Sequence, residues 1–122
     1  MNIFSWNYHL FFLFSKENYQ DVALDIQSTW EDGINVGFMS IIDKNSIQLK
    51  VFERGSGFTM ACGSGACAAA AVAISKNKLE TPITVNMDGG VVQIDWEMKN
   101  TMILSGSAEI SFEGEVSLNV YA

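Results

Sequence analysis

The spacing of apolar residues divides the first half of the chain into a strand, a helix and a hairpin. Aromatic and branched residues crowd the segment from Phe4 to Phe14, which favours a strand that enters the core. From Lys16 to Glu31 the apolar residues recur at helical spacing, and Gly33 follows as a stop signal. Two β-rich runs come next, Ile34 to Ile42 and Ser46 to Glu53, and the polar turn between them predicts a hairpin.

The second half combines an all-apolar helix with further short strands. From Ser64 to Ile74 most residues are alanine, and no polar face interrupts the helix. A helix that is apolar all round is normally buried, and small side chains let strands approach it closely. Between Thr81 and Tyr121, turn signals separate about four or five strands. We therefore predict an α+β fold, in which a curled, mostly antiparallel β-sheet or barrel of about seven strands wraps around a central small-residue helix.

Length and composition predict one folding unit. The chain has 122 residues, of which 48% are hydrophobic, so one core can form without disulfides. We therefore expect a single domain over residues 1–122.

Charge argues against polyanionic partners. Seven Lys and Arg residues stand against fourteen Asp and Glu residues, a formal net charge of −7. This balance repels phosphate backbones and anionic lipids, so we expect neither nucleic acid nor membrane as a partner. The apolar run from Ile3 to Phe14 lacks a basic start and a cleavage site, and no run reaches the roughly 20 residues of a membrane span.

The two cysteines do not suit a disulfide or a metal. Cys62 and Cys67 lie five residues apart in a helical run, so their side chains diverge by about 140°. His9 is the single histidine, and the sequence offers no zinc-ligand spacing. We expect a reduced, cytoplasmic protein without a metal.

The start of the alanine-rich helix is the best candidate for chemistry. Gly63, Ser64 and Gly65 follow Cys62, and amide N–H groups at a helix start lack partners and attract anions. The same helix end favours a thiolate at Cys62, whereas Cys67 lies deeper and reads as an inert core residue. A purely structural buried thiol at Cys62 is the alternative.

Adjacent charges precede this helix at the end of the second hairpin strand. Glu53 and Arg54 lead into a glycine loop that ends near Cys62. An arginine guanidinium can bind a carboxylate and a glutamate can bind an ammonium group, so the pair suits an amino-acid ligand. Alternatively, adjacent opposite charges at a strand end are often only a solvent-exposed pair. Two other polar residues also have simple structural interpretations. Asn35 suits a turn, and His9, in an apolar strand, suits a buried core position.

Three motifs resemble one known family. They are Asn35-Val36-Gly37-Phe38-Met39, the run from Val51 to Gly57, and Ala61-Cys62-Gly63-Ser64-Gly65-Ala66-Cys67-Ala68. Together they resemble the C-terminal half of diaminopimelate epimerase. The resemblance implies a cofactor-independent isomerase, without pyridoxal phosphate, that interconverts LL- and meso-diaminopimelate in lysine and peptidoglycan-precursor synthesis.

The resemblance also implies roles for particular residues. Family enzymes invert a stereocentre with two cysteines on opposite faces, and Cys62 matches one of them. Gly63 and Ser64 match the amides that hold the reacting carboxylate. Family positions that bind the substrate, largely at its distal amino-acid end, match Asn7, Asn35, Glu53 and Arg54. Family positions that tune the protonation of the thiols match Glu53 and His9.

The family has two similar domains with the substrate between them, and this chain resembles one. We therefore expect a missing N-terminal domain as a partner, no activity in isolation, and self-association or a homodimer through exposed apolar residues such as Phe58 and Met60. The alternatives are a non-catalytic stand-alone domain that binds an amino acid or assists assembly, and a related racemase acting on another amino acid.

Overall fold

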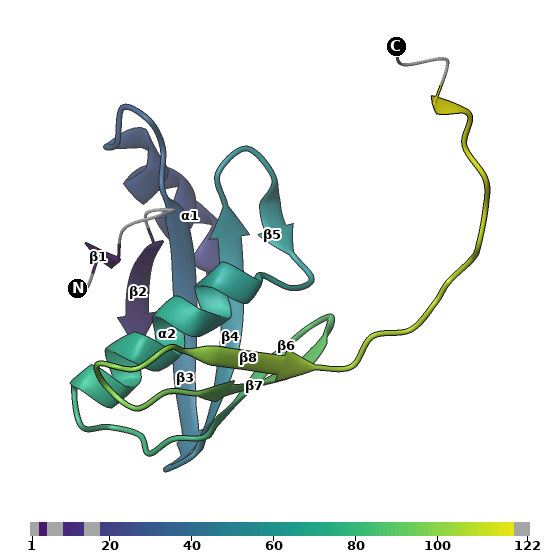
Figure 1. Ribbon diagram of the computed structural model, residues 1–122. Coiled ribbons are helices and arrows are strands. Elements are labelled where there is room, and N and C mark those ends of the chain that lie inside the picture. The colour runs from purple at the N-terminus through teal and green to yellow at the C-terminus, as the bar shows by residue number, and fades with distance from the viewer. Residues whose placement is uncertain (1–2, 5–8, 14–17, 119–122) are drawn as a thin grey trace.

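The computed structural model describes residues 3–4, 9–13 and 18–118. Over these residues the chain forms two helices and eight strands (Figure 1). In chain order the elements are β1 (Ile3–Phe4), β2 (His9–Leu13), α1 (Tyr19–Ser28), β3 (Asn35–Asp43), β4 (Ser46–Glu53), β5 (Gly57–Thr59), α2 (Gly63–Ser75), β6 (Ile83–Met87), β7 (Gly90–Asp95) and β8 (Ile103–Gly106).

All the described strands belong to one mixed sheet. Its order is β1-β2-β3-β4-β6-β7-β8, with β5 paired to β4. The pairs β2/β3 and β4/β6 are parallel, and the other pairs are antiparallel. The predicted α+β class and the mostly antiparallel, curled sheet are therefore confirmed. Over the described residues the sheet stays open, since its order does not return from β8 to β1, and a closed barrel is not formed.

Helix α2 occupies the concave side of this sheet. It contacts β2, β3, β4, β6 and β7, and Figure 1 shows β2, β3 and β4 behind it. Its small residues Gly65, Ala66 and Ala69 to Ala73 are buried against strand side chains such as Ile47 and Leu49. The expectation that α2 is buried on every side was wrong in one respect. Cys67 and Ala68 are only partly buried, so one side of the helix reaches the surface.

Helix α1 covers the opposite face of the sheet. Ala23 is fully buried in a second cluster with Ile34, Val36, Phe38 and Phe52. Strand β3 packs against both helices, because successive residues of a strand point to opposite faces of the sheet. The helix is shorter than the predicted Lys16 to Glu31, because Asn18 before it has a left-handed φ of 85°. Residues 16 and 17 lie outside the described part of the chain.

Three strand predictions need correction. The run from Phe4 to Phe14 contains two described strands, β1 and β2, which pair antiparallel with each other, while residues 5–8 and 14 lie outside the described residues. The glycine loop after Glu53 contains an extra strand, β5, because Gly55 and Gly57 adopt positive φ and turn the chain back onto β4.

The region after Thr81 has three described strands rather than four or five. Strand β8 ends at Gly106, and residues 107–117 form neither helix nor strand. Strand pattern alone does not make a strand, because the backbone also needs a neighbour to pair with.

Among the described residues, no helix is long and apolar enough to span a membrane.

Candidate functional site

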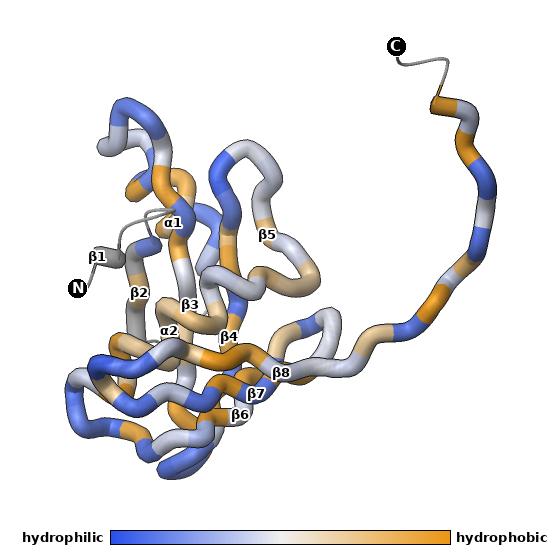
Figure 2. Tube along the Cα trace, viewed as in Figure 1, coloured by the Kyte–Doolittle hydropathy of each residue, from blue (hydrophilic) through white to orange (hydrophobic). Residues whose placement is uncertain are grey.

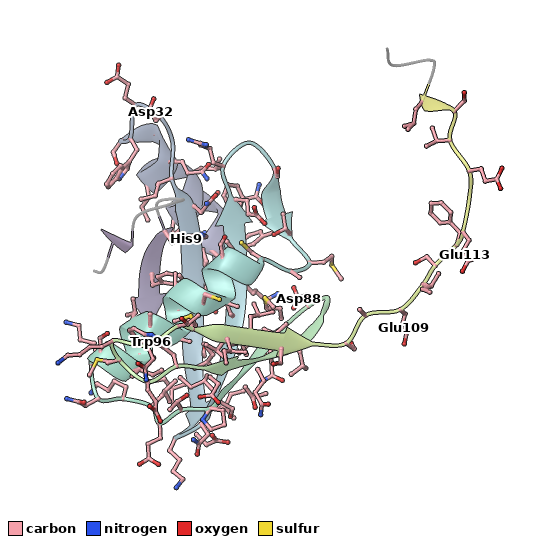
Figure 3. All side chains as sticks on the ribbon, in the orientation of Figure 1. His9, Asp32, Asp88, Trp96, Glu109 and Glu113 are labelled. Carbon is pink, nitrogen blue, oxygen red and sulfur yellow. The ribbon has the colours of Figure 1, made fainter. Side chains whose placement is uncertain are left out.

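The sequence-predicted residues gather at one end of the sheet, next to the start of α2. Strand β2 begins at His9 and β3 at Asn35, and these two residues are partners in a parallel register. Strand β4 runs antiparallel to β3, so it ends at the same place, at Glu53. Figure 3 labels His9 in this region. Asn7, predicted to bind substrate, lies outside the described residues.

Cys62 stands immediately before the first turn of α2. It is 8% exposed, its backbone is extended, and its carbonyl accepts a hydrogen bond of 2.9 Å from the Ala66 N–H. The following amide N–H groups have no intrahelical acceptors, so they present a partial positive charge at this end. Gly65 gives close packing here, since a Cβ would lie 3.1 Å from the Cys62 Sγ and 3.1 Å from a Val51 methyl, so that either neighbour would have to shift by a few tenths of an ångström.

Ser64 connects Cys62 to His9. Its hydroxyl lies 3.6 Å from the Cys62 Sγ and 3.3 Å from the His9 Nε2. Ser64 and His9 are separated by 55 residues, so only the fold creates this chain of three polar groups. The hydroxyl can donate to one neighbour while it accepts from the other. Cys62, Ser64 and His9 therefore form a hydrogen-bonding row along the start of α2.

Burial favours the uncharged form of His9 in this row. It is 1% exposed and stacks on Phe11, with ring centroids 5.8 Å apart. Burial lowers the pKa of His9, and the carboxylate of Glu53 partly opposes this by favouring the imidazolium. Its Nδ1 atom is buried without a hydrogen-bond partner in the described part of the chain.

Glu53 is fixed by a residue that the sequence analysis missed. Its Oε1 accepts a 2.6 Å hydrogen bond from the hydroxyl of Thr59 on β5. The β4/β5 hairpin brings them together, with Val51 opposite Thr59 and Glu53 opposite Gly57. The two glycines with positive φ were the signal that could have revealed this hairpin.

Arg54 and Asn35 form hydrogen bonds within the protein. The Arg54 backbone N–H donates to the Asn35 Oδ1 at 2.8 Å, and its Nη1 donates to the Asp32 carbonyl at 2.6 Å. The Arg54 side chain packs on Gly33, where a Cβ would lie 2.6 Å from the Arg54 Cδ. The contacts of the guanidinium thus lead to the loop before β3 rather than to Cys62.

Cys67 is less buried than the core position that the sequence predicted. Both cysteines are free thiols, but Cys67 is partly exposed while Cys62 is buried. Burial of the Cys67 sulfur is the larger cause that raises the pKa of Cys67, and the electrostatic effect of the nearby Cys62 raises it further. Across the described residues, no cluster of three or more His, Cys, Asp or Glu side chains could hold a metal ion.

Structural comparison defines the class of fold. Two crystal structures of phenazine biosynthesis proteins of the PhzF family resemble the chain, one from Enterococcus faecalis (TM-score 0.60) and one from Bacillus anthracis (TM-score 0.61). Each is 15% identical in sequence. The matches cover 76% and 84% of this chain, and 35% of either structure. This likeness shows a shared fold.

Sequence comparison identifies the family. The diaminopimelate epimerase family model matches residues 23–111, and the chain therefore belongs to this family. The diaminopimelate epimerase of Burkholderia vietnamiensis is 44% identical over 91 residues, 71% of this chain and 32% of the relative. That of Burkholderia pseudomallei is 37% identical over 100 residues, 79% of this chain and 35% of the relative. The chain thus spans about a third of the length of these relatives.

We expect Cys62 to be alkylated faster than Cys67 by a small reagent at neutral pH. Exposure favours Cys67, but the thiolate is the reacting species, and burial raises the pKa of Cys67, whereas Cys62 lies beside the unpaired amides that begin α2. Mass mapping after brief treatment measures the two sites in one sample. Equal labelling, or faster labelling of Cys67, would contradict this assignment.

Proposed function

We propose that this chain supplies one half of a two-thiol isomerase site, which interconverts LL- and meso-diaminopimelate without pyridoxal phosphate or a metal. Family membership supports the reaction. The observation that carries the proposal is the position of Cys62, buried beside the unpaired amides that begin α2 and linked through Ser64 to His9.

The chemistry explains why a thiol belongs at a helix start. The α-proton of an amino acid is very weakly acidic, so its removal needs a close thiolate and stabilisation of the charge that develops on the carboxylate. The amides of Gly63 and Ser64 are placed to stabilise that carboxylate. In one direction Cys62 takes the proton as thiolate, and in the other its thiol returns it. The second thiol, on the opposite face, comes from the portion of the relatives that this chain does not span.

The remaining residues have supporting roles in this proposal. Glu53 and His9 set the protonation of the thiols. Asn7, Asn35, Glu53 and Arg54 bind the distal amino-acid end of the substrate. Binding through Arg54 requires its guanidinium to exchange the Asp32 carbonyl for a substrate carboxylate, which offers a charged and therefore stronger acceptor.

A chimera tests the proposal. The matched segment of the Burkholderia vietnamiensis epimerase is replaced by the corresponding residues of this chain, and interconversion is followed from each stereoisomer. We expect turnover, and we expect Cys62→Ala to lower it by about a thousandfold or more, because the acid or base on one face is lost. The control Cys67→Ala, on the same helix, should stay within roughly threefold of the parent chimera.

A folded chimera without turnover would overturn the proposal. If that chimera still bound diaminopimelate, the chain would be an amino-acid-binding domain instead. Inversion of another amino acid in place of diaminopimelate would indicate a related racemase.

We also expect the isolated chain to self-associate through exposed apolar residues near the Cys62 loop. Phe58 is 43% exposed and Met60 is 64% exposed, although Phe58 also packs edge-on against Phe52 at 5.0 Å. Sedimentation over a concentration series to roughly 100 µM detects contacts of about 5.5 kcal/mol. Phe58→Glu should weaken the association. Ile42→Glu, which alters an exposed apolar residue at the other end of the β3/β4 hairpin, should not. A strict monomer would contradict this expectation.

A further inference from the structure

Thr59, on the short strand β5, holds the carboxylate of Glu53. Its hydroxyl donates a 2.6 Å hydrogen bond to the Glu53 Oε1. A hydrogen bond to an ionised carboxylate is shorter and stronger than one between neutral groups. A glutamate side chain otherwise rotates about several bonds, and it loses entropy when it is fixed. Thr59 therefore restricts the Glu53 side chain within the protein itself.

The strand register places this hydrogen bond on the α2 side of the sheet. Thr59 lies opposite Val51, which packs in the core cluster that contains the α2 alanines. Glu53 is two residues further along β4, so it points to the same face as Val51. Diagonal neighbours on paired antiparallel strands are within reach of long side chains. Figure 2 shows β4 changing from hydrophobic to hydrophilic colour at the end that leads to β5.

The backbone of Thr59 is fixed from both sides. Before it, Phe58 packs edge-on against Phe52, with ring centroids 5.0 Å apart. After it, the Met60 carbonyl accepts a 2.6 Å hydrogen bond from the Gly89 N–H in the β6/β7 turn. A Cβ at Gly89 would lie 2.8 Å from the Met60 oxygen, so this contact depends on glycine. Two independent contacts thus set the position of a strand that is three residues long.

We propose that Thr59 is a positioning residue, which turns Glu53 so that its second oxygen, Oε2, receives an ammonium group of the substrate. This inference rests on the proposed function, in which Glu53 binds the distal amino-acid end. The hairpin does not depend on the Thr59 hydroxyl, because β5 pairs with β4 over three residue pairs. A carboxylate that is oriented in advance binds more tightly, since less side-chain entropy is lost when the ligand arrives.

His9 reports the position of the Glu53 carboxylate. It is the single histidine of the sequence, so its ring signal in an NMR titration is unambiguous. Burial lowers the pKa of His9, and the Glu53 carboxylate opposes this effect. Of the titratable groups described, Glu53 on β4 acts on the ring directly, and the Cys62 thiol lies beyond Ser64 on α2. A carboxylate that swings away therefore lowers the pKa of His9 further.

Titration of the 122-residue chain tests the positioning step. Thr59→Val removes the hydroxyl but keeps the shape and strand preference of the side chain, so the hairpin is retained. We expect a lower pKa of His9 in Thr59→Val than in the unmodified chain, and no change in Thr59→Ser, which keeps the hydroxyl. Glu53→Gln should lower it too. In the Glu53→Gln background Thr59→Val should have no further effect, because Thr59 acts through that carboxylate.

The matched control is Thr84→Val, the same substitution in β6. Thr84 lies opposite Ser46, where β4 begins, whereas Glu53 stands where β4 ends. The titration of His9 should therefore be the same in Thr84→Val as in the unmodified chain.

Ligand binding tests the functional step. In the chimera with the Burkholderia vietnamiensis epimerase, the Cys62→Ala background prevents turnover, and calorimetry then measures the dissociation constant of diaminopimelate. Thr59→Val should bind about tenfold more weakly, as expected when a hydrogen bond to a charged group is lost. Thr59→Ser and Thr84→Val should stay within about threefold of that background. In the active chimera the loss should appear mainly in KM, since the distal end is bound equally in the ground state and the transition state.

Several results would overturn the inference. One is a His9 titration that is identical in Thr59→Val and the unmodified chain. Another is equal weakening of ligand binding by Thr59→Val and Thr59→Ser, which would indicate a purely structural role. Unchanged binding in Thr59→Val, or no binding by the chimera, would also overturn it.

Failure of the proposed function has a different signature. A chimera that binds diaminopimelate in a manner that depends on the Thr59 hydroxyl, but that shows no turnover with Cys62 intact, would reject the isomerase and uphold the positioning role of Thr59.

Discussion

A protein made of these 122 residues alone should show no measurable interconversion of LL- and meso-diaminopimelate. Inversion requires a base on one face of the α-carbon and an acid on the other. The described site holds one thiol at the start of α2, and Cys67 cannot serve the opposite face because it belongs to the same helix. Direct assay of the purified chain with the LL stereoisomer measures this, to a limit set by the uncatalysed background.

The Cys62→Ala chain is the control for that assay. Both proteins should give the same background rate, and addition of the N-terminal portion of a relative should raise only the rate of the unmodified chain. Turnover that scales with the concentration of the chain alone, and that disappears in Cys62→Ala, would show that one domain contains both acid and base. The proposal that this chain supplies only one half of a two-thiol site would then be wrong.

The second large effect is expected from Gly37→Ala in the middle of β3. A Cβ at this position would lie 2.4 Å from two ring carbons of Phe11, a side chain that is 5% exposed and stacked on His9. The ring cannot yield without disturbing both the core and the site. We expect the free energy of unfolding to fall by about 2–3 kcal/mol and the melting temperature to fall by roughly 8–12 °C.

Gly114→Ala is the matched control for this substitution. No atom lies within 4 Å of a Cβ built at Gly114, so the melting temperature should change by less than about 1 °C. Calorimetry or circular dichroism of the two variants provides the comparison. A Gly37→Ala protein as stable as the parent would mean that Phe11 repacks freely, and that the close contact between β2 and β3 is unimportant for stability.

Local pattern predicted the elements whose neighbours are close in sequence. The β-rich runs Ile34 to Ile42 and Ser46 to Glu53 predicted a hairpin, which the structure confirms as β3 and β4. The alanine run predicted an interior helix, because only side chains this small allow strands to surround a helix axis closely. Sequence pattern was weaker where glycines change the direction of the chain, and β5 was missed for this reason.

The candidate site shows a similar division. The motif around Cys62 predicted a thiol at a helix start, which depends on neighbouring residues alone. The contact between Ser64 and His9 and the hydrogen bond that occupies Arg54 could not be predicted in this way. A guanidinium has several acceptors within reach, and the fold decides which carbonyl lies nearest.

By itself the sequence determined the α+β class, the central small-residue helix and the position of Cys62, because each depends on the periodicity or chemistry of neighbouring residues. The tertiary structure decided that the sheet stays open over the described residues, that Ser64 joins Cys62 to His9, and that the chain leaves the sheet after Gly106. These features depend on register and on contacts between distant segments. Such contacts form only when the whole chain minimises its exposed apolar surface and unpaired backbone groups together.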